Sequence, residues 1–580
     1  MRDEGVDQPL TSRFMSRRPA TGLLVIFAPA AIIFALAASG ISQQKVRKTN
    51  TTPSLISESA LRAHIKFLAD DLLEGRGTGA RGGELAALYV AAQFEALGLK
   101  GAGPNGSFWQ QVSLVGVKAD PETQLRVNGP EKAAAFKFGD EFVAFTGAQT
   151  ERVSVNSDLV FVGFGIDAAE HHWNDYKGPP EDYRGKILVM LVNQPMPVGE
   201  PDLFGGKRLS YYGRWTYKYE EAARRGAAGV ILLHTDESAG YPWSVVRTSN
   251  ATWRFDPARE KGDKEPFLNI RAWMTDEAAH RMFSLSGQNL DELHKQAASR
   301  DFKPVKLNLT ASIDLNSELK RVEAPNVVAI LTGRDLKLRR EYVVFSAHWD
   351  HFGIGAADKR GHNIYNGAVD NASGVASVLE IARVLANLPA AEKPGRSILF
   401  LIPTAEEQGL LGSEWYSKHP LVPLSETAAD INLDSMNVFG LTRDFVPLGA
   451  ERSSLKAVAE AVARERGMRI SPDPRPEQGS FYRSDHFPFA KVGVPSISLK
   501  EGDDFIGRPK GWGEKQFREF NEQHYHQPSD QYSDSWDFRG MIQEAEIAMA
   551  IGRRVADANE MPKFNPGDEF ASVMRSTKSH

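Results

Sequence analysis

The sequence predicts an α/β protein: a mixed sheet with helices on both of its faces, and a second, smaller α/β unit inserted into it. The first observation is that short β-branched runs and helix-spaced segments alternate between residues 326 and 499, which is typical of sheets whose strands are joined through helices. The second is that residues 151–273 carry strands and a helix of their own ahead of that alternation. The third is an ordinary globular composition, with 42% hydrophobic and 25% charged residues in a chain of 580.

Composition also excludes several classes of function. The net charge is −5 and no long basic run occurs, so nothing in the charge indicates nucleic-acid binding. The chain has no cysteine, which excludes disulfide bonds, thiolate metal sites and cysteine nucleophiles. A metal ion in this protein would therefore be held by histidines and carboxylates.

The first 48 residues have the order of an export signal. Arg17 and Arg18 precede the apolar segment 22–41, whose end is rich in small residues. The same segment is just long enough to span a bilayer, so an uncleaved anchor is the alternative. We therefore expect residues 1–48 to be a signal peptide or a membrane anchor, and the remainder to be exported to the periplasm or the exterior.

Residues 49–145 are expected to form the N-terminal helical part of the main domain. Apolar residues recur at helical spacing over 61–73 and over 84–97. The Gly-rich turn between them, 74–79, lacks the lysine of a phosphate-binding loop and follows no strand. It is therefore interpreted as a plain loop.

Residues 146–315 are assigned to the inserted unit. Its apolar runs predict strands at 159–165, 186–192 and 226–233 and a helix at 217–225. Its segments VFVGFG, DYRGKILVM and RGAAGVILL resemble those of a protease-associated domain. Three histidines lack acidic neighbours at metal-binding spacing and are interpreted as surface or core side chains: His171, His172 and His234.

The main domain is expected to resume at residue 316 and to end near 565, with 566–580 as a tail. Its strands are predicted at 326–331, 342–347, 397–402, 431–433 and 496–499, and helices at 373 onward and 453–466. In sheets of this kind, ligands bind at the carboxyl ends of the strands.

Ionisable side chains gather at those carboxyl ends. His348 and Asp350 follow the strand 342–347, and residues two apart on an extended chain face the same side. Two later strands are followed by Glu406, Glu407 and Asp434. Asp370 precedes a helix, and His526 stands late in the chain.

These residues suffice for two divalent cations. Nitrogen and oxygen donors suit zinc, which takes about four ligands. The set permits Asp370 to bridge both ions, with His348 and Asp434 on one and Glu407 and His526 on the other. Two zinc ions would lower the pKa of a water shared between them.

Three further tasks follow from this arrangement. Glu406 would take the proton of the water and deliver it to the leaving amine. Asp350 would hold the second ring nitrogen of His348. Tyr525 would donate a hydrogen bond to the tetrahedral oxyanion.

Two motifs are set aside. His351 and His362 are taken to line the cleft without binding metal. The run Ser484, Asp485 and His486 suggests a nucleophilic triad, but adjacent residues cannot converge as a triad requires. A loop that lines the cleft is the better interpretation.

Six segments carry a family resemblance: HWDH, NGAVDNASG, EEQGLLGS, NLDSMN, SDHFPF and YHQPSD. They resemble the co-catalytic dizinc aminopeptidase family, whose relatives include glutamate carboxypeptidases and glutaminyl cyclases. The resemblance spans about residues 326–557 and implies a zinc-exopeptidase fold. It also implies the pairing of ligands given above, two zinc ions, and Glu406 as the base.

The leading hypothesis is a metal-dependent exopeptidase that removes N-terminal residues from peptides. A carboxypeptidase would need a basic group for the terminal carboxylate, and Arg483 is the only one inside a cleft-lining motif. A glutaminyl cyclase would use a single zinc ion and lack the inserted domain. A receptor-like scaffold is disfavoured because all five ligands and the base are present.

Overall fold

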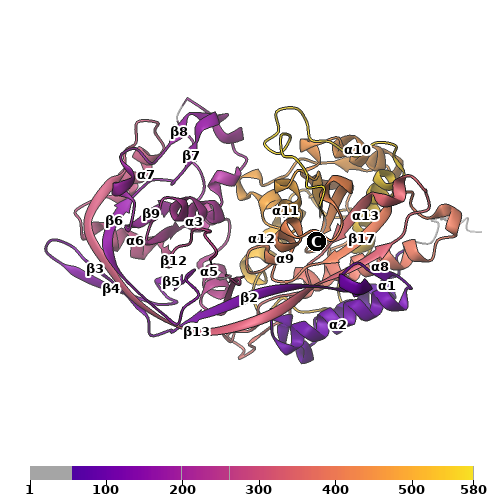
Figure 1. Ribbon diagram of the computed structural model, residues 1–580, viewed down its shortest axis with the longest axis horizontal. Coiled ribbons are helices and arrows are strands. Elements are labelled where there is room, and N and C mark those ends of the chain that lie inside the picture. Colours follow the sequence, from indigo (N-terminus) through magenta and orange to yellow (C-terminus); the bar gives the residue numbers. More distant parts are fainter. Residues whose placement is uncertain (1–54, 198, 260–261, 579–580) are drawn as a thin grey trace, which may run out of the picture. The chain divides into compact units, whose positions relative to one another are not determined.

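The computed structural model describes residues 55–197, 199–259 and 262–578, and in them two sheets share one long strand. This strand, β13 (Val305–Leu331), is visible in Figure 1 as the ribbon that continues from one sheet into the other. Its first half pairs antiparallel with β6 (Arg152–Phe161) and β3 (Gln124–Asn128). Its second half pairs antiparallel with β2 (Trp109–Ala119) and β17 (Ser397–Ile402).

The main sheet is mixed, as predicted. Its central strands β17, β14 (Tyr342–Ser346), β18 (Thr427–Leu433) and β21 (Ser496–Glu501) are parallel neighbours in that order. Beyond β21 lies the antiparallel strand β19 (Asp444–Leu448), which pairs with β20 (Arg469–Ile470). Two short strands pair at the other side, β1 (Lys100–Gly101) with β13 and β11 (Arg254–Pro257) with β2.

Helices cover both faces of the main sheet, because its central strands are apolar on both sides. Along β14, Val343 and Phe345 face one core and Val344 faces another. The first core includes residues of α1 (Glu58–Leu68), α2 (Arg81–Ala96), α8 (Gly374–Ala386), α10 (Leu455–Arg466) and α13 (Arg539–Asp557). The second includes residues of α9 (Leu411–Lys418) and α11 (His486–Lys491).

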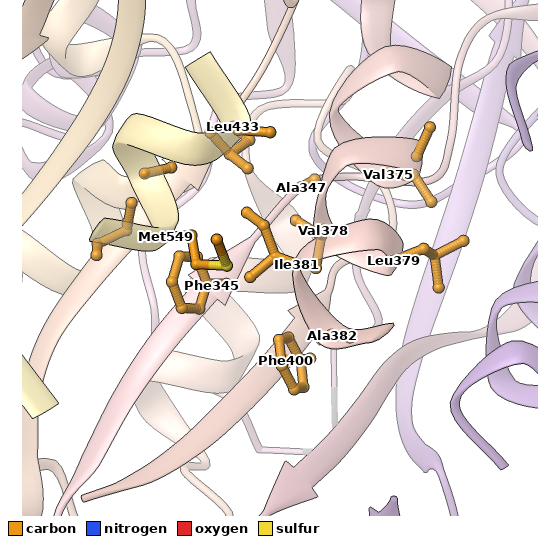
Figure 2. Close-up of a cluster of buried hydrophobic side chains, with 14 of the residues drawn as sticks. Phe345, Ala347, Val375, Val378, Leu379, Ile381, Ala382, Phe400, Leu433 and Met549 are labelled. Atoms are coloured by element: carbon orange, nitrogen blue, oxygen red, sulfur yellow. The ribbon is translucent and has the colours of Figure 1, made fainter. Parts of the chain in front are cut away.

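The core beneath α8 explains why that segment is helical. Val375, Val378 and Ala382 recur at helical spacing, and Figure 2 shows them on α8 with Phe345 and Phe400 of the sheet beneath. A buried Val, Leu or Phe of this kind contributes roughly 1.5–3 kcal/mol. The main sheet and its helices thus form one packed layer, and the carboxyl ends of its parallel strands lie along one edge of that layer.

The second sheet belongs to the inserted domain and has a core of its own. From β6 it continues through β9 (Ile187–Leu191), β10 (Gly229–His234), β12 (Ile270–Thr275) and β5 (Phe142–Phe145). On the other side of β13, β3 pairs with β4 (Ala133–Lys137). Its helices are α3 (Trp215–Arg224), α4 (Asp236–Ala239), α5 (Trp243–Asn250), α6 (Asp276–Ser284) and α7 (Leu290–Ala297).

The structure differs from the expectation that residues 49–145 are helical. Only α1 and α2 fit it; from residue 109 onward the segment forms β2 to β5. Moreover, β3, β4 and β5 belong to the second sheet, so that sheet recruits chain well ahead of residue 146. These strands are short, and β3 and β5 pair with β13 and β12, more than a hundred positions away, which leaves little local signal for their place in the second sheet.

Two expectations concern the ends of the chain. The predicted signal or anchor, 1–48, lies outside the described residues. Among the residues that are described, no helix is both long and apolar enough to cross a bilayer. The tail contains no helix or strand over 566–578, as expected, but it is held against the main domain: Phe570 is buried, and Arg575 donates to the carbonyl oxygens of Gly493 and Thr427 at 2.7 and 2.9 Å.

Candidate metal centre

Three parallel strands bring most of the candidate ligands to one edge of the main sheet. β17, β14 and β18 are neighbours, so their carboxyl ends lie side by side. His348 follows β14, Glu406 and Glu407 follow β17, and Asp434 directly follows β18. This is the edge at which the sequence predicts a site.

The other two candidates lie outside the strands. Asp370 occupies a wide turn, 368–373, that leads into α8, as expected; the peptide bond between Asp370 and Asn371 is cis. His526 follows α12 (Trp512–Gln523), and its φ of 56° is in the left-handed region that non-glycine residues rarely adopt. Backbone of this kind is concentrated at functional sites.

His348 has the environment of a metal ligand. Its Nε2 is buried without a hydrogen-bond partner and faces carboxylate oxygens of Asp370 at 3.3 Å and Asp434 at 3.6 Å. Its Nδ1 lies 3.1 Å from the carbonyl oxygen of Asp350, which can only accept, so in the neutral ring Nδ1 carries the proton and the lone pair of Nε2 is available to a metal ion. Burial by itself would lower the pKa of His348, but Glu406 and the other carboxylates raise it well above its ordinary value. A site that attracts positive charge this strongly fits a cation.

Asp370 is placed between the two histidines. Its Oδ1 lies 3.3 Å from Nε2 of His348, and its Oδ2 lies 3.4 Å from Nε2 of His526. His526 Nε2 also lies 3.1 Å from Glu407. In two overlapping groups of three residues, one ligand atom from each residue lies within 4.8 Å of the other two. The groups are His348, Asp370 and Glu407, and His348, Glu406 and Asp434.

The pKa values separate Glu406 from the carboxylates assigned as metal ligands. Burial alone would raise the pKa of Asp370, but hydrogen bonds from His348 and His526 hold it well below its ordinary value. The pKa of Asp434 falls to about 2, because nearby lysine and histidine charges outweigh burial. For Glu406, burial dominates and raises the pKa well above its ordinary value. A carboxyl group with a raised pKa, next to ligand carboxylates whose pKa values are lowered, is typical of a group that transfers protons.

The Asp350 carboxylate lies farther from His348 than expected. β14 ends at Ser346, so His348 and Asp350 do not share the face of an extended strand. The carboxylate oxygen of Asp350 lies 3.9 Å from Nδ1 of His348, and it is the backbone carbonyl that holds the ring. The carboxylate instead accepts from the amide of Glu406 at 3.1 Å and from the Thr78 hydroxyl at 3.2 Å. Asp350 therefore positions the backbone of Glu406.

Residues that the sequence interpretation left without a role hold the ligands in place. His351 Nδ1 lies 2.5 Å from Glu407 Oε1, and the Ser484 hydroxyl donates to Asp434 Oδ2 at 2.6 Å. Asp530 accepts from the amide of Asp370 at 3.0 Å. All three lie in segments that carry the family resemblance, HWDH, SDHFPF and YHQPSD. Their place in these segments is the sequence signal that could have indicated a role at the site.

The Gly-rich turn 74–79 also supports the site. Its first residues end a short 3-10 helix, Asp71–Arg76, and only the remainder is the expected loop. Arg76 is fully buried and donates to the carbonyl oxygens of Trp349 at 2.8 Å and Gly367 at 2.9 Å. Burial lowers the pKa of Arg76 to about 10, so the guanidinium remains charged near neutral pH. It ties together the loops that carry His348 and Asp370.

As predicted from the sequence, the residues Ser484, Asp485 and His486 do not form a catalytic triad. The Ser484 hydroxyl points to Asp434, and Asp485 accepts from the Ser413 hydroxyl at 2.6 Å. His486 is buried with both ring nitrogens unpaired, and burial lowers its pKa to about 3. In the inserted domain, His234 is buried and its Nε2 lies 3.1 Å from the carbonyl oxygen of Tyr241, away from the candidate ligands.

Two cavities adjoin the cluster and share several of its residues. One, of about 280 Å³, lies between the main and inserted domains; the other, of about 180 Å³, lies within the main domain. Glu406, Tyr525 and His526 line both. The ring of Tyr525 stacks on His526 with centroids 3.8 Å apart. Burial and the carboxylate charges raise the pKa of Tyr525 well above its ordinary value, so its hydroxyl stays protonated and able to donate.

Comparison with known proteins is consistent with this geometry. Residues 326–550 match the family model described as Peptidase family M28. The chain is 35% identical over 125 residues to "Aminopeptidase NAALADL1" of Mus musculus, which covers 21% of this chain and 15% of that protein. It is 29% identical over 207 residues to "Aminopeptidase YwaD" of Bacillus subtilis (strain 168), covering 35% of this chain and 39% of that protein. These curated relatives are thus matched over well under two thirds of their length.

Among solved structures, the chain is similar to "Aminopeptidase from Aneurinibacillus sp. strain AM-1". The TM-score is 0.51 at 20% sequence identity, and the similarity covers 88% of this chain and 97% of that one. At this identity the likeness concerns the fold. It extends through most of the described chain, the inserted domain included.

Proposed function

We propose that this protein, whose residues 326–550 match the model of peptidase family M28, is a metal-dependent exopeptidase that removes N-terminal residues from peptides. One observation carries the proposal: the two carboxylate oxygens of Asp370 face different histidines, His348 and His526, at 3.3 and 3.4 Å. A carboxylate so placed fits a bridge between two cations.

The proposed cofactors are two zinc ions. Asp370 would bind both, His348 and Asp434 would complete one site, and Glu407 and His526 the other. Nitrogen and oxygen donors of this kind suit zinc. When bound, zinc would supply Lewis acidity, which lowers the pKa of a water and polarises a peptide carbonyl. A glutaminyl cyclase would use one ion only, and a scaffold none.

Glu406 is proposed to move the proton. It lies beside the ligands, with Oε2 3.8 Å from Nε2 of His348, and it lines both cavities. It would accept a proton from water as the water oxygen attacks the scissile carbonyl. It would then give that proton to the amine nitrogen as the C–N bond breaks. Tyr525 would donate to the oxyanion from the same wall.

A second candidate, cleavage at the carboxyl end, is favoured by one feature. Arg214 and Arg483 line the cavity between the two domains, and the Nε atom of each is buried without a hydrogen-bond partner. Arg483 also donates to the carbonyl oxygen of Ala239 at 2.8 Å. Guanidinium groups of this kind could hold a terminal carboxylate.

A defined peptide and its N-acetylated copy distinguish the two candidates. We expect loss of N-terminal residues from the free peptide, read by mass, and no cleavage of the acetylated copy. Shortening of both peptides from the carboxyl end at equal rates would contradict the aminopeptidase proposal. Arg483 and Arg214 would then be the first residues to replace.

Two finer expectations remain proposals. The inserted domain is proposed to be a protease-associated domain. Residues 1–48 are proposed to direct export, with anchoring through 22–41 if they are not cleaved. Cell fractionation should find the protein outside the cytoplasm, whereas a soluble cytoplasmic pool that begins at Met1 would contradict export.

A further inference from the structure

One arginine of the inserted segment 146–315, on a strand that pairs with β2 of the main sheet, reaches the backbone of a candidate metal ligand. Arg254 opens β11 and is 5% exposed. Its guanidinium donates to the carbonyl oxygen of Glu407 at 3.2 Å and to that of Gln408 at 2.8 Å. The Gln408 side chain in turn accepts from the amide of Phe255 at 3.2 Å. The inserted segment is therefore joined to the metal-binding turn by reciprocal hydrogen bonds, made where that segment runs along the main sheet.

A second residue of the same segment lies against another candidate ligand. Ser249, near the end of α5, has its hydroxyl 3.4 Å from Nδ1 of His526. Arg254 also donates to the backbone carbonyl of Ser249 at 3.3 Å, which links the two contacts. Ser249 and Arg254 thus reach His526 and Glu407, the two residues assigned above to the same ion.

A purely structural role would not require a charged group here. Burying a guanidinium costs free energy, and every hydrogen bond described above for the Arg254 side chain goes to a backbone carbonyl oxygen. The planar fork of arginine can hold adjacent carbonyls at once, so it fixes the orientation of the peptide that carries the Glu407 side chain. A small rotation of that peptide would swing the carboxylate out of line with His526.

We propose that Arg254 and Ser249 are positioning residues, through which the inserted segment 146–315 fixes Glu407 and His526 for the ion that these two ligands hold. The inference rests on the proposed metal site and gives the inserted segment a defined part in it. Partners that orient metal ligands typically contribute about 10–100-fold in metal affinity or activity. The effect should fall on one of the two ions.

The test compares Arg254→Met with Arg271→Met. Arg271 lies on β12, and its guanidinium pairs at 3.1 Å with Asp256, on the same strand as Arg254. Its replacement therefore removes a charged contact of β11 while the hydrogen bonds to the metal-binding turn remain. Metal-free protein is titrated with zinc against a chelating indicator, and kcat and KM are measured separately. We expect Arg254→Met to weaken one zinc site by about 10–100-fold and leave the other unchanged. Arg271→Met should leave both unchanged.

Two further variants keep the inference falsifiable. Arg254→Lys retains the charge but loses the fork, so it should give an intermediate zinc affinity, and Ser249→Ala a smaller loss at the same site. If Arg254→Met does not fold, Arg254→Lys against Arg271→Lys decides. Wild-type affinity at both sites in Arg254→Met or, failing that, Arg254→Lys would overturn the inference. A wild-type protein that binds no zinc would instead overturn the proposed function.

Discussion

Replacing Glu406 with glutamine removes a proton acceptor from the metal centre while keeping the shape of the side chain. Glu406 is 9% exposed, so bulk water has little access to take over the task. Its backbone amide remains bound to Asp350 at 3.1 Å, because the substitution does not touch it. General-base catalysis typically contributes about 10²–10⁴-fold. We therefore expect kcat to fall by at least about a hundredfold, which raises the barrier by about 2.7 kcal/mol or more.

The same variant should keep its metal, because Glu406 is not assigned as a ligand. The assay is zinc content per chain after dialysis, measured beside kcat on an N-terminally free peptide. Glu407→Gln is the matched control, since it changes the adjacent residue and should lose zinc from one site. If Glu406→Gln lost zinc while Glu407→Gln kept it, the roles assigned to the two residues would be reversed.

Two more substitutions test other parts of the account. Ser484→Ala removes the hydroxyl that donates to Asp434 at 2.6 Å and should weaken zinc binding by about tenfold; an unchanged zinc dissociation constant would show that this contact does not position the ligand. Phe345→Ala empties a fully buried site beneath α8 and should lower the free energy of unfolding by about 3–5 kcal/mol in a urea titration. Leu88→Ala, at a side chain that is 56% exposed, should change it by no more than about 0.5 kcal/mol, and equal losses in both variants would contradict the assignment of the core.

Much of the main domain could be predicted because its signals are local. The strand expected at 397–402 is observed as β17 with the same bounds. The helix predicted from the apolar spacing after residue 373 is observed as α8. The alternation of strands and helices predicted a sheet with helices on both faces, and this is also observed. Each of these depends on residues a few positions apart, which side-chain periodicity reports well.

The parts that were missed depend on distant contacts. The first half of β13 (Val305–Leu331) alternates buried and exposed residues, which is a local strand signal, but that one strand serves two sheets depends on its distant partners. The Asp350 carboxylate lies 3.9 Å from His348 Nδ1 because β14 ends at Ser346, so residues 348 and 350 do not alternate as they would on a strand. Arg76 binds a carbonyl 291 residues away, and Arg254 one that is 154 residues away. No spacing rule connects such positions.

The central claim is a two-ion site built from one bridging carboxylate, and zinc titration tests it most directly. Metal-free protein, prepared with a chelator, should have no peptidase activity, and zinc should restore activity as about two ions bind per chain. Asp370→Ala should abolish binding of both ions, whereas His526→Ala should spare one. Full activity in excess chelator with metal confirmed absent, or saturation at a single ion with full activity, would contradict the account.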